Sequence, residues 1–478
     1  MNQPPDFITT NPAGQERVHP YFLARHVCDH LPFLIVRNSG RNTPQIYVYQ
    51  NGVYVCCDED TFKGHIKRFI TEYNEALVSM KVLNETCSLL MTDLRHERID
   101  DLNKEENIIN FENGILVLAE NELQLIPHDP RFHSTVRIPC RWIEDPVDTP
   151  VFNDYLDTLT DNDPQIKELL LEFIGVVLSN VKGYRTKKAL FMVGPGDSGK
   201  SQLKSLCERL IGPDNFSSCD FSDLEERFGT SDLYGKRLAG SADASHMSIK
   251  ELKTFKKLTG GDSIHAEFKG QKAFDFTFNG LLWLCMNSLP KFGGDNGPWV
   301  YERIMVIECN NVIPREKQDK LLLDKMFAER EGIVQKAVFA LQRVIQNGYC
   351  FNEPPCVIEN RKKYMSENNS VSLFWNECMV RRSDGRKDDP CSSGKVYKVY
   401  KAWCRDNEHG FAKTASEFRA DVCALLGVSS YGDLTVSRNG YPVFKDYTLS
   451  LEARHNYAAA FGSDADIGIW IPFDVGGG

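Results

Sequence analysis

The fold of this chain is decided by the stretch 188-KALFMVGPGDSGKS-201, in which an apolar run leads into a glycine-rich loop. The apolar run predicts a buried β-strand, and the loop fits the pattern GxxxxGK[ST] at every fixed position. Leucines at helical spacing follow, and they predict a helix that begins at Lys200. Strand, glycine loop and helix in this order predict an α/β core that binds the phosphates of a nucleotide.

Each part of the loop has a chemical task. The glycines allow backbone N–H groups to curve around phosphate oxygens, and the start of the next helix adds a positive dipole end. The Lys200 side chain can reach the β- and γ-phosphates of ATP, and the Ser201 hydroxyl can bind Mg²⁺. We therefore expect ATP and Mg²⁺ as cofactors. The residues expected to bind the nucleotide are Gly194, Pro195, Gly196, Asp197, Ser198, Gly199, Lys200 and Ser201.

Hydrolysis of ATP also requires a metal-binding carboxylate, a polar residue that orients water and a cation that stabilises the transition state. Asp243 ends a strand expected over 237–243, and Asn287 ends a strongly apolar strand expected over 281–286. Arg303 precedes another apolar run and can act as an arginine finger. The alternatives are a loop aspartate, a turn asparagine and a solvated arginine. The expected catalytic residues are Lys200, Asp243, Asn287 and Arg303, with Ser201 and Asp243 as metal ligands.

No general base stands out in the sequence. Ala244 follows Asp243, at a position where a second acid often sits. Glu251 belongs to the pattern Ser248-x-x-Glu251, which we interpret as a capping box at the start of a helix. The lone Asp243 therefore leaves open how water is activated.

The composition bounds the class of protein. The 478 residues are 42% hydrophobic, carry a formal net charge of −10 and include 6 Trp, 17 Tyr and 28 Phe, so a disordered acidic chain is excluded and two or three domains are expected. The longest apolar stretch is too short for a membrane span, and no leader is visible, so we expect no membrane partner and a cytoplasmic location in a bacterial host or virus-infected cell. The 15 cysteines form no CxxC pair, which favours reduced thiols and no structural metal.

Turn signals divide the rest of the chain. An Asn51-Gly52 turn between β-rich runs predicts a hairpin, and a second strand pair is expected over 114–118 and 123–126. These elements, mixed with helical stretches, predict a flexible arm over 1–15 and an α+β domain over 16–165. The α/β core then occupies 166–345.

The third region shows the order helix, helix, hairpin, which is that of a winged helix. The first helix is expected over 395–404, the second starts at the capping box Thr414-x-x-Glu417, and the hairpin joins 434–437 to 443–449. We expect a winged-helix DNA-binding domain over 346–452 and a tail over 453–478, with a protein-docking module as the alternative. The basic residues that could contact DNA there are Lys413, Arg419, Arg438 and Lys445.

The motifs together resemble those of superfamily 3 helicases, in the phage and plasmid primase-helicase group related to the poxvirus primase-helicase. The matching text is FMVGPGDSGKS, GKRLAGSAD, KKLTGGDSIHAEFK, LLWLCMN and ERIMVIE, and Leu258–Asp262 followed by a lysine looks like the motif peculiar to this superfamily. Upstream, NFENGILVL and TVRIPCRWIEDPVDTPVFNDYL are similar to the domain that precedes this ATPase. The resemblance covers about residues 20–450.

The resemblance implies an AAA+ P-loop ATPase core with an N-terminal helicase-associated domain and a C-terminal winged helix. It implies that Arg303 is supplied to a neighbouring subunit of a homo-oligomeric ring, commonly a hexamer. Lys269 would lie on a hairpin in the ring channel and grip DNA, with His265 and Lys272 as weaker contacts on the same hairpin. No segment resembles a catalytic primase domain, so we expect a helicase part without its own primase.

The leading hypothesis is therefore an ATP-dependent DNA helicase for replication of a phage, plasmid or mobile element. Its partners would be single-stranded and forked DNA and a separate primase or replication initiator. A second hypothesis is an origin-recognition or loader switch that binds ATP but scarcely unwinds DNA, which the missing acid beside Asp243 keeps open. A third is a non-replicative AAA+ ATPase, against which the Thr259-Gly260-Gly261-Asp262 text argues.

Overall fold

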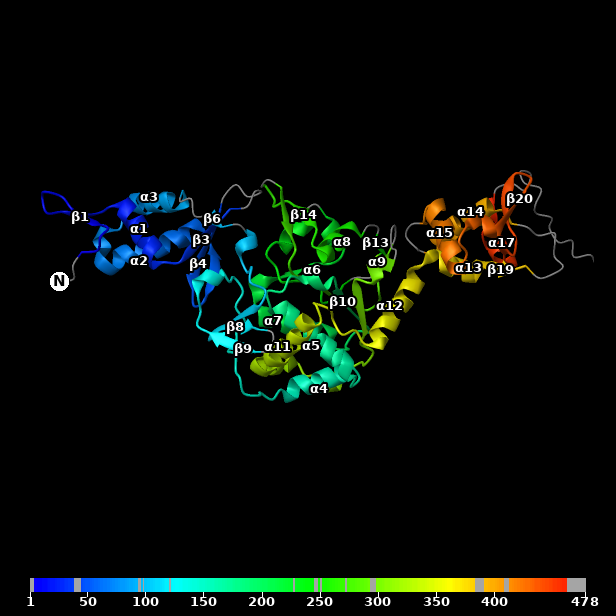
Figure 1. Cartoon of the computed structure of the whole chain (residues 1–478), viewed down its shortest axis with the longest axis horizontal. Coiled ribbons are helices and arrows are strands. Elements are labelled where there is room, and N and C mark those ends of the chain that lie inside the picture. Colours follow the sequence, from blue (N-terminus) through cyan, green and yellow to red (C-terminus); the bar gives the residue numbers. More distant parts are fainter. Residues whose placement is uncertain are drawn as a thin grey trace, which may run out of the picture.

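The chain forms three bodies along its length, and the computed structural model places a parallel sheet in the middle one (Figure 1). A long helix, α12 (Pro355–Asn368), leads from the central body to the C-terminal body. The residues that the structure describes are 4–37, 44–92, 96–97, 99–119, 122–226, 228–244, 248–249, 252–270, 273–292, 298–382, 391–407 and 412–461. Within these ranges, no helix is both long and apolar enough to cross a membrane.

The N-terminal body packs helices against a four-stranded sheet in the order β5-β4-β3-β6. The hairpin expected at Asn51-Gly52 is present, with β4 and β5 as its antiparallel strands. The elements are β1 (Ile8–Thr10), β2 (Glu16–Val18), α1 (Pro20–His30), β3 (Phe33–Val36), β4 (Gln45–Gln50), β5 (Val53–Cys57), α2 (Glu59–Asn74), α3 (Met80–Met91) and β6 (His96–Glu97).

The expectation of a flexible arm over 1–15 is wrong for the described part of that segment. Residues 8–10 form β1, which pairs with β2, and the Phe7 side chain is fully buried in the core of the N-terminal body. The segment is ordered because the Phe7 ring is buried, and burial of one large aromatic side chain contributes about 2 kcal/mol of stability.

The central sheet has five parallel strands in the order β11-β12-β16-β10-β18. Three expected strands are present: one before the glycine-rich loop, one before Asn287 and one after Arg303. The edge strand β11 was not expected. The strands are β10 (Ala189–Val193), β11 (Phe216–Ser218), β12 (Leu238–Gly240), β16 (Leu281–Met286) and β18 (Ile304–Glu308).

The strand expected over 237–243 ends earlier, at Gly240. This glycine has φ +134°, and a Cβ atom there would lie 2.0 Å from the Trp283 carbonyl oxygen on the neighbouring strand. The backbone leaves the regular ladder at this close approach, yet the Ala244 N–H still donates to the Cys285 carbonyl at 2.8 Å. Asp243 is therefore carried past the end of β12 and stays alongside β16.

Helices and short sheets surround this core. Helices α5 and α11 pack very closely at Gly175. A Cβ atom at this position of α5 would lie only 2.3 Å from the Ala337 carbonyl oxygen on α11, so a larger residue would clash. The elements are β7 (Ile108–Phe111), β8 (Gly114–Leu118), β9 (Leu123–Ile126), α4 (Pro150–Leu159), α5 (Pro164–Leu178), α6 (Gly183–Thr186), α7 (Lys200–Ile211), β13 (Ser248–Ile249), α8 (Lys253–Gly260), β14 (Ser263–Ala266), β15 (Phe274–Thr277), β17 (Lys291–Phe292), α9 (Pro298–Tyr301), α10 (Leu322–Ala328) and α11 (Arg330–Gln346).

The hydrophobic cores show that the central body extends beyond both boundaries expected for the central domain, 166 and 345. One continuous core joins Phe111 on β7 and Phe152 on α4 to Leu341 on α11, so the central body begins well before residue 166. Tyr364 on α12 is buried in the second core of the same body, which therefore continues past residue 345. Sequence periodicity defines elements but not the body against which each element packs.

The C-terminal body has its own core, built around Phe374, Tyr400 and Trp403. The capping box Thr414–Glu417 is present, and the second helix ends at Gly427 as expected. The elements are α13 (Ser370–Cys378), β19 (Met379–Arg381), α14 (Ser393–Asp406), α15 (Ala415–Leu426), α16 (Tyr431–Leu434), β20 (Thr435–Arg438), β21 (Tyr441–Phe444), β22 (Tyr447–Leu449) and α17 (Leu451–Asn456).

Two details of this body differ from the expectation. The second hairpin strand is not continuous over 443–449: β21 pairs with β20, whereas β22 pairs with β19. The segment expected to start a tail at 453 instead belongs to α17, and Ala453 and Tyr457 pack on the core of the C-terminal body. The tail segment 467–473 lies outside the described residues.

Candidate functional site

The glycine-rich loop leaves the carboxyl end of β10 and closes at the first turn of α7. Gly194 has φ +157°, and a Cβ atom there would lie 2.1 Å from the Cys309 carbonyl oxygen. The next strand is held against the loop by the Cys309 N–H, which donates to the Val193 carbonyl at 2.7 Å. A side chain at position 194 is therefore excluded both by the backbone conformation and by its neighbour.

The Lys200 ammonium group lies inside the loop. Its Nζ donates to the carbonyls of Gly194 and Pro195, each at 2.8 Å, and to Ser198 Oγ at 2.9 Å. The residue is only 6% exposed. The helix start thus places a buried positive charge beside the glycine-rich loop, and a cation in this position is suited to bind an anionic group.

Ser201 connects the loop to the segment after β12. Its Oγ donates to the Ala242 carbonyl at 2.7 Å, one residue before the exposed Asp243. The Ser201 hydroxyl and the Asp243 carboxylate supply hard oxygen ligands from adjoining elements, which suits Mg²⁺ bound through one carboxylate, waters and substrate phosphates. Among the described residues, no group of three or more His, Cys, Asp or Glu side chains could hold a metal ion by itself.

These residues line one cavity of about 830 Å³, together with Asn287 at the end of β16. We call residues 196–201, Asp243 and Asn287 the loop wall. The sequence-derived candidates Lys200, Ser201, Asp243 and Asn287 are thereby brought together, although they come from three separate segments of the chain. They meet because the carboxyl ends of parallel strands lie at one edge of the sheet.

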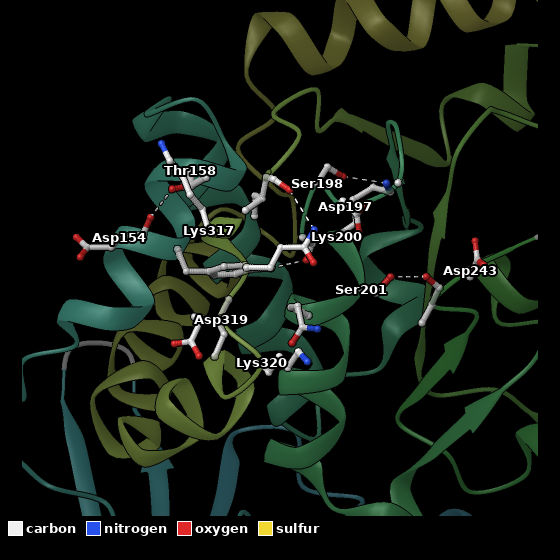
Figure 2. Close-up of a pocket in the computed structure, with 18 of the residues that line it drawn as sticks. Asp154, Thr158, Asp197, Ser198, Lys200, Ser201, Asp243, Lys317, Asp319 and Lys320 are labelled. Atoms are coloured by element: carbon white, nitrogen blue, oxygen red, sulfur yellow. Dashed lines mark hydrogen bonds between the residues drawn. The ribbon is translucent and has the colours of Figure 1, made fainter. Parts of the chain in front are cut away.

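The cavity has a second side that the sequence did not reveal. Figure 2 shows Asp154 and Thr158 on one helix, and Lys317, Asp319 and Lys320 on a later segment, across from Lys200. We call α4 and residues 313–325 the opposite wall. No motif marks these positions, and α4 was assigned to the preceding domain, so only packing could identify them.

Hydrogen bonds connect the opposite wall to the loop. The Tyr155 hydroxyl donates to the Gly199 carbonyl at 2.8 Å, and the Ile313 N–H donates to the Asp197 carbonyl at 2.9 Å. The Asn311 amide, two residues before the 313–325 segment, donates to the Thr158 carbonyl at 2.8 Å and so connects the chain leading into that segment to α4. Burial raises the pKa of Tyr155 well above its ordinary value, which keeps the hydroxyl a neutral donor.

Arg303 does not line this cavity. Its guanidinium Nη1 donates to Thr259 Oγ1 at 2.8 Å and to the Lys256 carbonyl at 3.3 Å, at the end of α8. The side chain therefore joins the TGGD motif to the start of β18, away from the nucleotide loop of its own chain. The structure separates this expected catalytic residue from the other three.

The hairpin β14-β15 carries the expected DNA contacts. Lys269 lies in its exposed turn, whereas His265 Nδ1 contacts Asp275 Oδ1 at 3.0 Å on the facing strand. The ring of Phe268, which precedes Lys269, stacks on Phe274 with a centroid distance of 5.0 Å. Lys272 lies outside the described residues.

The interpretation of Ser248-x-x-Glu251 as a helix cap is wrong. Helix α8 begins only at Lys253, and Ser248 belongs to β13, which pairs with β17 in parallel. Glu251 itself lies outside the described residues. A four-residue pattern describes only local sequence. It could not show that Ser248 pairs with a distant strand and that the helix therefore begins later, at Lys253.

Comparison with known families finds three matching segments. Residues 28–161 match the family described as D5 N terminal like, residues 366–433 match the family described as Poxvirus D5 protein-like, and residues 192–303 match a family of unknown function, DUF5906. D5-like sequence therefore lies on both sides of the segment that contains the nucleotide loop and Arg303.

Solved structures of the C-terminal region of NrS-1 match most of this chain at low similarity. The A form apo structure of this region is 13% identical, with a TM-score of 0.47, and the match covers 90% of this chain and 99% of that chain. The apo structure of residues 305–718 is 12% identical, with a TM-score of 0.44 and the same coverage. Similarity at this level is too low to support a conclusion about fold or activity.

Proposed function

We propose that this chain is an ATP-dependent DNA helicase that acts in replication of a phage, plasmid or mobile element. The observation that carries the proposal is the loop wall, where Lys200, Ser201, Asp243 and Asn287 meet at the carboxyl edge of a parallel sheet. A nucleoside triphosphate fits this chemistry, because a buried cation, a glycine-rich loop and hard oxygen ligands line one cavity.

In this proposal, each residue of the loop wall has one task. Lys200 leaves the loop carbonyls and binds the β- and γ-phosphates of ATP, while Ser201 and Asp243 hold Mg²⁺. Bound Mg²⁺ neutralises the charge that develops on the phosphates. Asn287, which ends the strand between β10 and β12, orients water against the γ-phosphate. The general base is not among these residues.

Two placements support a ring of identical subunits, which we propose to be hexameric. Arg303 lies outside its own cavity, as a finger supplied to a neighbouring subunit must. Lys269 lies in an exposed hairpin turn, where it can contact a strand in a central channel. A cation at a subunit boundary couples hydrolysis in one subunit to its neighbour.

The flanking bodies support a replication role. The D5-like matches at 28–161 and 366–433 agree with the resemblance to primase-helicases. The order α13, β19, α14, α15 and hairpin supports a C-terminal winged helix, and the parallel five-stranded sheet supports an AAA+ core. Single-stranded and forked DNA, and a separate primase or initiator, are the partners that we propose, in the cytoplasm of a bacterial or virus-infected cell.

The proposal is tested by ATP hydrolysis with and without single-stranded DNA, in the wild type and in Lys200→Ala. We expect hydrolysis that rises with DNA and falls by roughly 10²–10³ in the variant, because one charge-stabilising group is removed. Lys269→Ala should keep basal hydrolysis and ATP binding but lose the DNA stimulation. ATP binding without stimulated turnover in the wild type would contradict a motor.

That last outcome would favour a second function, an ATP-binding origin-recognition or loader switch. The observation that favours it is Ala244, which replaces a second acid after Asp243. A third candidate, a non-replicative AAA+ ATPase, would hydrolyse ATP at the same rate with and without DNA.

A further inference from the structure

The C-terminal body differs in charge from the rest of the chain. Residues 370–461 contain 13 Lys and Arg against 11 Asp and Glu, whereas the whole chain has 56 against 66. This body is therefore the part of an acidic protein that is best suited to approach a polyanion. The question is which of its faces does so.

The basic residues named from the sequence do not form that face. The Lys413 ammonium is paired with Asp421 at 2.5 Å and is only 12% exposed. Lys445 Nζ donates to the Asp433 carbonyl at 2.7 Å, and the Arg419 guanidinium lies over the Tyr431 ring, 5.6 Å from its centroid. Only Arg438, on β20, keeps an exposed position without one of these contacts.

The second helix of the expected winged helix, α15, is also poorly suited to phosphate. Along Ala415–Leu426 it carries Glu417, Arg419 and Asp421, so acidic residues outnumber the single basic one. Glu417 is fixed in the capping box, where its carboxylate accepts from the Thr414 N–H at 2.8 Å. A negative helix face repels the backbone that it would have to enter.

The first helix, α14, has the opposite character. Its buried side includes Val396, Val399, Tyr400 and Trp403, which pack into the core of the C-terminal body. Its exposed side includes Lys398, Lys401 and Arg405. At about 100° per residue, these three positions fall within an arc of roughly 60° on the helix, so their charges point in one direction.

The charges on this face are largely free of acidic neighbours. Among the described residues, no carboxylate forms an ion pair with Lys398 or Lys401, and the Lys401 ammonium lies 5.9 Å from the Tyr397 ring centroid. Arg405 is near Asp406, at 3.5 Å, but both groups are exposed, so that pair contributes little. The face has positive charge available for a partner.

We infer that α14 presents Lys398, Lys401 and Arg405 to the phosphate backbone of duplex DNA. The three residues span about 10 Å along the helix axis, which corresponds to about three nucleotide steps of one strand. Single-stranded DNA fits less well, because its non-specific recognition uses exposed aromatic platforms. The aromatic ring that lies beside Lys401, that of Tyr397, is half-buried against Tyr400 and Phe418.

This inference deepens the proposed function, on which it rests for the identity of DNA as the partner. The test uses the full chain without ATP, so that it does not depend on hydrolysis. Binding of a fluorescent duplex of about 30 base pairs, long enough to span several helical turns, is titrated at several salt concentrations. The variant is Lys398→Gln, Lys401→Gln and Arg405→Gln together, and the matched control is Lys67→Gln, Arg68→Gln and Lys81→Gln in the N-terminal body, which changes the net charge equally.

We expect the slope of log K against log[salt] to fall by up to about 2.7 in the α14 variant, at about 0.9 for each phosphate that the variant no longer neutralises. The control should keep the wild-type slope. A charge-retaining variant, Lys398→Arg, Lys401→Arg and Arg405→Lys, should also keep it, which separates removal of charge from failed folding.

An unchanged slope in the α14 variant would overturn the inference, as would an equal fall in the control. Loss of single-strand binding alone would overturn the assignment to duplex. If ATP hydrolysis proves absent but the slope falls as expected, the proposed motor fails while the α14 contact stands.

Discussion

The two walls of the cavity beside the glycine-rich loop differ in how their residues are distributed along the sequence. The loop wall follows from one contiguous motif and two strand ends, whereas the opposite wall joins α4 to residues 313–325, more than 150 positions later. In the proposed function, the loop wall carries the groups that act on phosphate, whereas the opposite wall carries lysines and a tyrosine whose hydroxyl donates to the loop. Arg303 belongs to neither wall. We therefore propose that chemistry and affinity are supplied by different parts of the fold.

The largest effect is expected from the residue outside both walls. Arg303→Ala should lower ATP hydrolysis by roughly 10³–10⁵, the range of an arginine finger, while the nucleotide still binds. Mixing this variant with Lys200→Ala subunits should restore part of the activity, because intact loops then meet intact fingers. Hydrolysis rates of the mixtures, measured across subunit ratios, check this expectation.

The contact between Arg303 and Thr259 provides the control for this prediction. Thr259→Val removes the hydroxyl that the guanidinium contacts at 2.8 Å, but keeps the charge. It should retain most of the hydrolysis. If Thr259→Val were as inactive as Arg303→Ala, and mixtures gave no recovery, Arg303 would be a structural residue and not a finger.

A smaller effect is expected from the cations of the opposite wall. Replacing both Lys317 and Lys320 by Gln should raise the KM for ATP about tenfold, because two exposed charges that face the phosphates add about 1.4 kcal/mol of binding. The kcat should change little, as for binding that is equal in the ground and transition states. Steady-state kinetics measures both constants.

The matched control is Lys362→Gln with Lys363→Gln on α12, where both residues are exposed and neither lines the cavity. These variants should leave KM unchanged. A fall in kcat with constant KM in the Lys317 and Lys320 variant would break the comparison, since the opposite wall would then take part in the chemistry.

The smallest effect is expected at Tyr155. Tyr155→Phe keeps the buried ring but removes the hydrogen bond to the Gly199 carbonyl, worth about 0.5–1.5 kcal/mol. We expect the Kd of a fluorescent ATP analogue to rise by about 2–10-fold, because the loop is then held less firmly. Titration of the analogue measures this change.

Tyr73→Phe is the control for Tyr155, because it removes a hydrogen bond of similar length, 2.7 Å to Glu16, in the N-terminal body. It should leave the Kd of the analogue unchanged. Equal effects of the two substitutions would show that Tyr155 contributes only to general stability.

The sequence predicted the elements better than their assembly. The strands over 189–193 and 281–286, the helix from Lys200 and the turn at Asn51-Gly52 were all found, because each is specified by local periodicity or turn chemistry. The strand over 237–243 was too long, because Gly240 sits against the Trp283 carbonyl, a contact from 43 positions away. Local patterns cannot report such a contact.

The candidate site shows the same division. Lys200, Ser201, Asp243 and Asn287 were named from motifs and meet in one cavity, whereas Asp154, Thr158 and Lys320 had no motif to mark them. The charged residues of the C-terminal body were visible, but not their partners: Lys413 is paired with Asp421, while Lys398 and Lys401 stay free of carboxylates within the described ranges. A basic residue therefore adds positive charge to the surface only where the fold leaves it exposed and without an acidic partner.

By itself, the sequence determined the glycine-rich loop, the strand that enters it and the helix that leaves it, because their backbone conformations depend on neighbouring residues and on glycine. Tertiary structure alone decided that α4 closes the cavity, that Arg303 turns toward Thr259 and away from its own loop, and that α14 carries the free charges. These outcomes depend on packing between segments that are far apart in the chain. Which side chains are buried, and which charged groups find partners, is decided only when those segments come into contact.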